Sequence, residues 1–373
     1  MRFAFTDEQE ELRAALRDLL TDRAPSARVR EIMQTPDGVD RELWRALAEM
    51  GIAGMLVPEE YDGLGFGFLE LAVALEEAGR ALLPAPLLST AVLGVTAVLA
   101  AEDPARAAEI LPGVAAGTIT LTVARSAPAA CTAVLRADGR WRLTGDLGTV
   151  LDGASADLVV VAATDPSGAT RLFTVSSDSG ARLPTMDQTV RLAHLVLDDT
   201  PATPLGGAGV AEAVLARVEQ LAAVGLALLA VGGAATCLDA SVEYARTRVQ
   251  FGRPIGSFQA IQHRCADMLL EVESARSAAY YASWCAVADP AALPVYASVA
   301  KSYATEAYRR AAGEQIQIHG GIGFTWEHDA HLHLKRAATL EALYGSPTEH
   351  RRLLWESLAT STEAGLVEPS ASR

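Results

Sequence analysis

Two segments of the chain carry residues of the types that bind phosphate. The stretch YARTRVQFG places Arg248 at the end of a long helical pattern, just before Gly252 interrupts it. A guanidinium can bond two phosphate oxygens in a planar fork. Further along, Gln317 can donate and accept hydrogen bonds, and Gly320–Gly321 would let the backbone approach a ligand closely. These residues indicate a phosphate-bearing ligand, whereas the plainer interpretation is a helix cap and a turn.

Other kinds of chemistry are less well supported by the sequence. His328, His331 and His333 stand close together, but no carboxylate pattern completes a metal site, so we expect histidines on a helix surface. Neither a G-x-G-x-x-G after a strand nor a G-x-x-x-x-G-K-[ST] motif is present. None of the four cysteines forms a C-x-x-C pair, which favours a reduced, cytoplasmic compartment without structural zinc.

The composition narrows the possible partners. Half of the 373 residues are apolar and 21% are charged, as in a globular protein with a large core. The net charge of -15 disfavours nucleic acid, because phosphate backbones require clustered cations. The N-terminus lacks the apolar core of a signal peptide. Leu221–Leu238 carries no charge over 18 residues, and we interpret it as a helix buried in a bundle and not as a membrane span.

The elements that must position these residues follow from the changing periodicity. Residues 1–112 read as helices, with a capping box over Thr6–Gln9. Residues 113–205 read as short strands with a hairpin at Asp138-Gly139. Residues 206–373 read as long helices over 209–248, 258–288, 292–318 and 330–343, with another after the stretch 341–350 and a disordered tail from about 362. The sequence therefore predicts an α+β chain with a β domain between two helical domains.

Taken together, the Arg-x-x-Phe-Gly and Gln-x-x-Gly-Gly-x-Gly elements resemble the acyl-CoA dehydrogenase family over essentially the whole chain. The resemblance implies an N-terminal helical domain, a middle β-barrel or sandwich and a C-terminal four-helix bundle. It implies FAD as the cofactor and the α,β-dehydrogenation of an acyl-CoA, with an electron-transfer flavoprotein as electron acceptor. The residues that it assigns to FAD are Arg248, Phe251, Gln259, Gln317, Gly320, Gly321 and Ser346.

In this family the FAD contacts are shared across a subunit interface. The resemblance therefore implies a homo-tetramer, or an α2β2 heterotetramer with a glutamate-bearing homologue, as in bacterial steroid side-chain dehydrogenases.

The chain departs from the family where catalysis takes place. The position of the usual base, a glutamate, holds Tyr344, and the alternative base position on the first long C-terminal helix holds Ala222. A phenol has a reference pKa of about 10 and is a poor base at neutral pH. Thr149 and Leu151 replace the family's tryptophan and threonine beside the flavin ring. The catalytic residue is therefore unknown at this stage.

Three functions remain open from the sequence. The first is an acyl-CoA dehydrogenase, either with a displaced base or as one of two unlike subunits. The second is a non-catalytic subunit that binds acyl-CoA or FAD, and the third is a flavin-dependent monooxygenase of the same superfamily, which needs no α-carbon base. Carboxylates that would compensate for the missing glutamate are Glu219, Glu327, Asp329, Glu341 and Glu349. Glu219 stands three residues before Ala222, and this spacing predicts that the two share a helix face.

Overall fold

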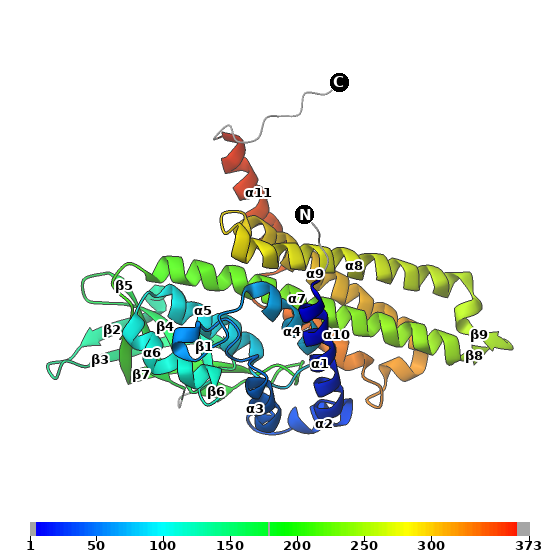
Figure 1. The fold of residues 1–373 in the computed structure, drawn as a ribbon, viewed down its shortest axis with the longest axis horizontal. Coiled ribbons are helices and arrows are strands. Elements are labelled where there is room, and N and C mark those ends of the chain that lie inside the picture. Colours follow the sequence, from blue (N-terminus) through cyan, green and yellow to red (C-terminus); the bar gives the residue numbers. More distant parts are fainter. Residues whose placement is uncertain (1–4, 178–179, 364–373) are drawn as a thin grey trace. The chain divides into compact units, whose positions relative to one another are not determined.

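A computed structural model describes residues 5–177 and 180–363 (Figure 1). The chain forms two compact units, one ending at Gly225 and the other beginning at Leu226, so that helix α7 (Ala211–Thr247) contributes to both. The fold confirms the α+β class, with helices, then strands, then helices along the chain.

Helices open the first unit. They are α1 (Asp7–Arg23), α2 (Ser26–Ile32), α3 (Arg41–Glu49), α4 (Phe68–Arg80), the π-helical η2 (Leu88–Gly94), α5 (Val95–Ala100) and α6 (Pro104–Ala115). The predicted capping box is confirmed, because the Gln9 amide donates to Thr6 Oγ1 at 3.3 Å and the Thr6 amide donates to Gln9 Oε1 at 3.2 Å. Helix α1 packs on α4, where Arg17 forms a bidentate pair with buried Glu77 at 2.6 and 2.9 Å.

A small β-barrel completes most of the first unit. Its strands are β1 (Leu121–Val123), β2 (Cys131–Leu135), β3 (Trp141–Leu151), β4 (Leu158–Thr164), β5 (Thr170–Ser176), β6 (Gly180–Arg182) and β7 (Leu192–Leu205). The order β4-β2-β3-β7-β5 closes on itself because β5 also pairs with β4. The interior is apolar and includes Leu143, Phe173 and Leu195, all fully buried.

Two details of this unit differ from the sequence expectation. Helix α6 continues through residue 112, where we placed the end of the first domain, and ends at Ala115. The predicted hairpin is present, but its turn is longer than two residues: the Arg136 amide donates to the Arg140 carbonyl at 2.9 Å, which leaves three residues in the loop. Gly139 takes the left-handed position in that loop at φ +78°, where an L side chain would be strained.

The second unit is helical. It contains the end of α7, the short hairpin β8 (Val249–Gln250) and β9 (Arg253–Pro254), α8 (Gln259–Ala288), α9 (Leu293–His319), α10 (Ala330–Ala342) and α11 (Pro347–Glu363). Helix α9 packs against α8, α10 and α11, which makes it the central helix of the unit. Because α11 continues to Glu363, only residues 364–373 of the predicted disordered tail remain, and these lie outside the described residues.

One helix of the described residues is long and apolar enough to cross a membrane. This helix is α7, and 94% of its most apolar window is buried inside the protein. Burial of that extent explains the uncharged run Leu221–Leu238 as core sequence, as we expected.

Substituting a glycine of α7 tests the packing inside the second unit. A Cβ at Gly233 would lie 2.3 Å from Tyr308 Cζ, so we expect Gly233→Ala to lower the free energy of unfolding by about 1–3 kcal/mol through overpacking. Gly313 on α9 is the matched control, since a Cβ there meets no atom within 4 Å. Gly313→Ala is expected to stabilise by roughly 0.5–1 kcal/mol. Urea denaturation measures the change in the free energy of unfolding of each variant. Equal destabilisation of the two variants would contradict the prediction.

Candidate functional site

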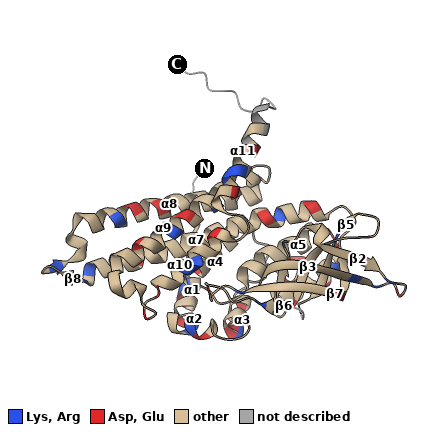
Figure 2. Cartoon of the chain, turned by 180° about the vertical axis from the view of Figure 1, so that it is seen from behind, with Lys and Arg blue, Asp and Glu red and all other residues tan. Residues whose placement is uncertain are grey.

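Arg248 lies where α7 gives way to the β8–β9 hairpin. Its amide still donates to the Tyr244 carbonyl at 2.8 Å, as in a helix, and its carbonyl accepts from the Ile255 amide at 2.8 Å across the hairpin. The side chain is exposed, and within residues 5–177 and 180–363 it has no hydrogen bond or ion pair. Figure 2 shows basic residues at this end of α7. The guanidinium is thus fixed at its base and available to an anion.

The tip of the hairpin presents an aromatic ring to the surroundings. Phe251 is 93% exposed and has a φ of +54°, a left-handed backbone that is unfavourable for a bulky residue. Its ring meets the edge of Phe258 at 6.1 Å, and Arg253 lies 4.1 Å over the same Phe258 ring. Gln259, the first residue of α8, is exposed beside them. An ordered, exposed aromatic of this kind is typical of a surface that another molecule covers.

The glycine pair follows the end of α9. Gly320 has a φ of +62°, which favours glycine, whereas Gly321 has no positive φ that would require one. A Cβ at either position would meet no atom within 4 Å. Packing within the chain therefore gives no reason for glycine at 321, and the open backbone fits the close approach of a ligand. Gln317, one turn earlier on α9, is exposed as well.

Stacked rings bring the two predicted phosphate-binding segments together. Tyr244, one turn before Arg248, stacks on His319 with the ring centroids 4.3 Å apart, and His319 meets His328 at 4.4 Å. His319 Nδ1 lies 2.8 Å from the Gln315 carbonyl, and burial lowers the pKa of this imidazole. The neutral ring packs in the stack without a charge and joins the ends of α7 and α9.

A second part of the candidate site is the loop between α10 and α11, residues 343–346. Tyr344 is half-buried at φ +56°, and Gly345 follows at φ +100°. Ser346 caps α11 in a reciprocal arrangement with Glu349: its amide and hydroxyl donate to Glu349 Oε2 at 2.7 and 2.8 Å, and the Glu349 amide donates to Ser346 Oγ at 3.3 Å. Glu349 is therefore engaged as a helix-capping residue.

Other candidate carboxylates also have structural contacts. Glu341 pairs with Arg309 at 3.5 Å. Glu219 forms a surface pair with Arg125 at 2.9 Å, with both side chains about half exposed, whereas Ala222 is completely buried. The sequence suggestion that Glu219 shares the environment of Ala222 is therefore wrong, because the two side chains point to different surroundings of α7. Of the remaining candidates, Glu327 is exposed and Asp329 immediately precedes α10.

The histidines near the start of α10 do not form the surface group that we expected. His333 is 4% exposed, and its Nδ1 lies 2.8 Å from the hydroxyl of fully buried Tyr308. His331 instead meets Trp326 with ring centroids 4.5 Å apart. The expectation failed at His333 because the helix turns that position toward the core, where a hydrogen-bonded imidazole is tolerated.

The first unit contains Thr149 and Leu151, the two positions that the resemblance assigns to the surroundings of the flavin ring. Thr149 is exposed on β3, and Leu151, at the end of the same strand, is buried at 8% exposure. Leu151 lacks a side-chain hydrogen-bond donor, and it contributes to the core.

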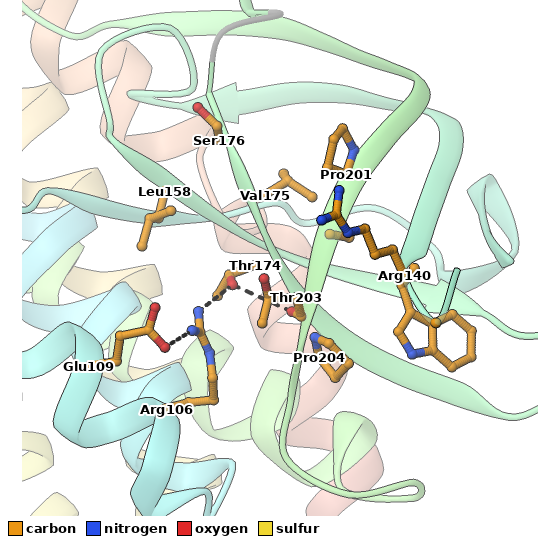
Figure 3. Close-up of a pocket in the computed structure, with 13 residues that line it drawn as sticks. Arg106, Glu109, Arg140, Leu158, Thr174, Val175, Ser176, Pro201, Thr203 and Pro204 are labelled. Atoms are coloured by element: carbon orange, nitrogen blue, oxygen red, sulfur yellow. Dashed lines mark hydrogen bonds and ion pairs between the residues drawn. The ribbon is translucent and has the colours of Figure 1, made fainter. Parts of the chain in front are cut away.

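A separate pocket of about 560 Å³ lies beside the barrel, between α6 and strands β5 and β7 (Figure 3). Arg106 enters it from α6, forms an ion pair with Glu109 and donates to Thr174 Oγ1 at 2.8 Å. The Thr174 hydroxyl in turn contacts the Thr203 carbonyl at 3.4 Å. These contacts link a helix to the barrel wall, and none of the predicted FAD-binding residues lines this pocket.

The sequence profile of the acyl-CoA dehydrogenase N-terminal domain matches residues 6–118, and that of the C-terminal domain matches residues 212–359. The chain belongs to the acyl-CoA dehydrogenase family. Acyl-CoA dehydrogenase IpdE2 from Mycobacterium tuberculosis is 38% identical over 360 residues, which cover 94% of this chain and 98% of that protein.

Solved structures of other acyl-CoA dehydrogenases share the fold. A variant of the Tcur3481-Tcur3483 steroid ACAD is 33% identical with a TM-score of 0.84, and the match covers 96% of this chain and 99% of that one. The ChsE4-ChsE5 complex from Mycobacterium tuberculosis is 29% identical with a TM-score of 0.87, again over 96% and 99%. Butyryl-CoA dehydrogenase from Megasphaera elsdenii is 26% identical with a TM-score of 0.88, over 96% and 100%.

Acyl-CoA dehydrogenases are flavoproteins that bind FAD and act as oxidoreductases, and the family includes homologues in steroid and lipid catabolism. The residue-level assignments made from the resemblance remain predictions for this member.

Lys301 and His350, which contact the 343–346 loop, were missed by sequence reasoning. The sequence did contain a signal for Lys301. This lysine stands among the alanines of α9 at the helical spacing that marks the buried face, so its burial could have been predicted.

Proposed function

We propose that this acyl-CoA dehydrogenase binds FAD and acts as one subunit of a heteromeric enzyme, in which a homologous chain supplies the catalytic glutamate. The observation that carries the proposal is the base position itself. Tyr344 occupies it, and the adjacent carboxylates Glu341 and Glu349 are engaged in an ion pair and a helix cap.

The proposal that this chain binds FAD rests on groups that lie open to a ligand in the described part of the chain. Arg248 presents a guanidinium without a partner in the described part of the chain, and Gly320–Gly321 offer backbone where an added Cβ would meet none of the described atoms within 4 Å. Arg248, Phe251, Gln259, Gln317, Gly320 and Gly321 would hold the adenosine diphosphate half, and Ser346 would contact the cofactor from the 343–346 loop. When bound, FAD accepts the hydride that leaves the β-carbon of the acyl group.

Exposed apolar side chains support assembly with another chain. Val249 and Phe251 in the hairpin are 53% and 93% exposed, and Ile322, Phe324 and Trp326 after the glycine pair are 45%, 84% and 62% exposed. Apolar groups gathered in two neighbouring segments mark an interaction surface. The similarity to the Tcur3481-Tcur3483 steroid ACAD and to the ChsE4-ChsE5 complex favours a homologous chain as the occupant. An electron-transferring flavoprotein is the proposed electron acceptor.

Co-expression tests the proposal directly. The chain alone is expected to purify with little flavin, and co-expression with a glutamate-bearing homologue is expected to yield a yellow complex that bleaches when acyl-CoA is added without oxygen. Bleaching by the chain alone would instead indicate a complete enzyme with its own base. Flavin bound only after reduction, with oxygen uptake, would indicate a monooxygenase, and a yellow complex that never bleaches would indicate a binding subunit.

Removing the guanidinium of Arg248 is expected to weaken FAD binding. The change Arg248→Ala deletes a charge-assisted pair worth roughly 1.5–3 kcal/mol, which corresponds to a loss of affinity of about 10–100-fold. The ratio of flavin absorbance to protein, measured through a dilution series of the purified complex, reports this loss. Arg246→Ala is the control, because Arg246 is also exposed and lies two residues earlier on α7. Unchanged FAD retention in Arg248→Ala would remove Arg248 from the cofactor site.

A further inference from the structure

Lys301 is a buried cation in the middle of α9. The sequence contains 29 arginines but only two lysines, Lys301 and Lys335. Lys301 is 0% exposed and ranks among the largest completely buried side chains. Its Nζ donates to the Gly345 carbonyl at 3.0 Å and to the Glu341 carbonyl at 3.2 Å. A compact ammonium with rotatable donors suits two converging carbonyls better than the flat fork of an arginine.

The two carbonyls lie on either side of the turn that ends α10. The last carbonyls of a helix lack partners within the helix and carry its partial negative charge. Glu341 belongs to the last turn of α10, and the Leu343 amide makes the closing bond to the Thr339 carbonyl at 3.0 Å. Lys301 therefore supplies the cation at this helix terminus and reaches across Tyr344 to the carbonyl of Gly345.

A second side chain fixes the carbonyl between them. His350, 6% exposed on α11, has Nε2 3.0 Å from the Tyr344 carbonyl and Nδ1 3.2 Å from Ser298 Oγ. Since a carbonyl can only accept, Nε2 carries the proton, and in the neutral ring Nδ1 accepts from the serine hydroxyl. Ser298 and Lys301 are three residues apart on α9, so one face of this helix holds the loop at two points.

The charged groups around the ammonium come from α9, α10 and α11. Glu341 on α10 and Glu349 on α11 both favour its charged form, and Arg309 on α9 pairs with Glu341. Burial opposes them and lowers the pKa of Lys301 to about 8. The loop that this cation holds includes Tyr344 at φ +56°, a conformation that persists only where the surroundings enforce it.

We propose that Lys301 is a positioning residue which, with His350, clamps the backbone of the 343–346 loop and so sets how Tyr344 and Ser346 face the cofactor. The orientation toward the cofactor rests on the proposed function, whereas the clamp itself does not. Removal of the amino group would release the Glu341 and Gly345 carbonyls together, and the left-handed residue between them would relax.

Hydrogen exchange of the full complex tests the clamp. Lys301→Met keeps the length of the side chain but removes its charge and its donors. In this variant, the protection of backbone amides from exchange is expected to fall by roughly ten-fold or more in peptides that cover residues 341–350, and to change little in peptides of α8. Lys335→Met is the control, since Lys335 lies 4.0 Å over the Trp326 ring and does not contact the loop carbonyls. Unchanged protection of residues 341–350 in Lys301→Met would overturn the clamp.

A measurement on the unsubstituted complex covers the case in which Lys301→Met does not fold. Protection factors of residues 341–350 are compared at pH 7 and pH 9.5, on either side of the pKa of about 8. The neutral amine still has N–H donors for both carbonyls, and an open loop would bind the proton more tightly than the closed loop, so protection of residues 341–350 is expected to rise at pH 9.5 relative to that of α8 peptides. Equal protection at the two pH values would show that opening of the loop does not expose Lys301, and would also overturn the clamp.

Flavin retention separates the clamp from the proposed function. Because Ser346 moves with the loop, Lys301→Met is expected to lower FAD retention by about ten-fold, as small displacements at a binding site do. Loss of protection without any change in flavin retention or in reduction by acyl-CoA would leave the clamp standing. It would show that the loop does not face the cofactor, which would be a failure of the proposed function at this loop.

Discussion

Reduction of bound flavin by an acyl-CoA is expected to be roughly 10²–10⁴-fold faster in a complex with a glutamate-bearing homologue than in this chain alone, the range that a positioned general base contributes. Neither family base position supplies a base here, because Ala222 is a buried methyl group and Tyr344 is a phenol. Glu349 is engaged in the cap of α11, and Glu341 is paired with Arg309. The lone chain would therefore have to abstract the α-proton without an unengaged carboxylate next to Tyr344.

Anaerobic stopped-flow absorbance at the flavin band measures the two rates. Tyr344→Phe in the complex is the matched control, and its rate is expected to stay within about three-fold because the phenol hydroxyl is not the base in this proposal. Tyr344→Glu in the lone chain is expected to stay near the slow rate, since Leu151 still offers no hydrogen-bond donor at the position that the resemblance assigns to a bond with the flavin. A lone chain that reduces flavin as fast as the complex would place the base within this chain.

The protein is expected to gain stability through Lys301 as the pH rises from about 8 to about 10. The pKa of the folded lysine is about 8, below its ordinary value of 10.5. Below pH 8 both the folded and unfolded states hold the proton, and the cost of burying the charge is present in full. Between the two pKa values the unfolded state binds more protons than the folded state, so the free energy of unfolding rises with pH. The difference of about 2.5 (10.5 minus about 8) corresponds to roughly 3 kcal/mol at 1.36 kcal/mol for each pKa unit.

Urea denaturation of the unsubstituted protein and of Lys301→Met, repeated from pH 7.5 to 10, isolates this contribution as the difference between the two curves. Lysine labelled with ¹³C at Cε gives a direct titration, because the chain has only two lysines and Lys335→Met leaves the signal of Lys301 alone. Parallel stability curves, or a Lys301 signal that titrates near 10.5, would show that burial does not lower this pKa.

Local patterns in the sequence predicted the features that local chemistry determines. The Thr6–Gln9 capping box, the hairpin at Asp138-Gly139 and the long C-terminal helices depend on residues close together in the chain, and the structure contains each of them. The glycine pair at 320–321 was recognised from spacing, and the stack of Tyr244 on His319 brings it to the same end of the second unit as Arg248.

The remaining features depend on contacts between distant residues, which no short pattern encodes. Closure of the barrel requires β5 to pair with β4, and the burial of His333 requires the Tyr308 hydroxyl from another helix. Glu219 seemed to share a helix face with Ala222, but its pair with Arg125 draws it to the surface. The role of Lys301 depends on two carbonyls 40 or more residues away in the sequence.

Under the proposed function, in which this chain binds an acyl thioester, the scarcity of lysine has a further consequence. Acyl thioesters modify uncharged amines, and the side-chain amines of this chain are limited to Lys301, which is inaccessible, and Lys335, which is partly covered at the Trp326 ring. The 29 arginine side chains are guanidiniums, which stay protonated in proteins and do not act as nucleophiles at neutral pH. Under the proposed function, the surface would thus present positive charge to the phosphates of an acyl-CoA while leaving little that its activated acyl group can modify.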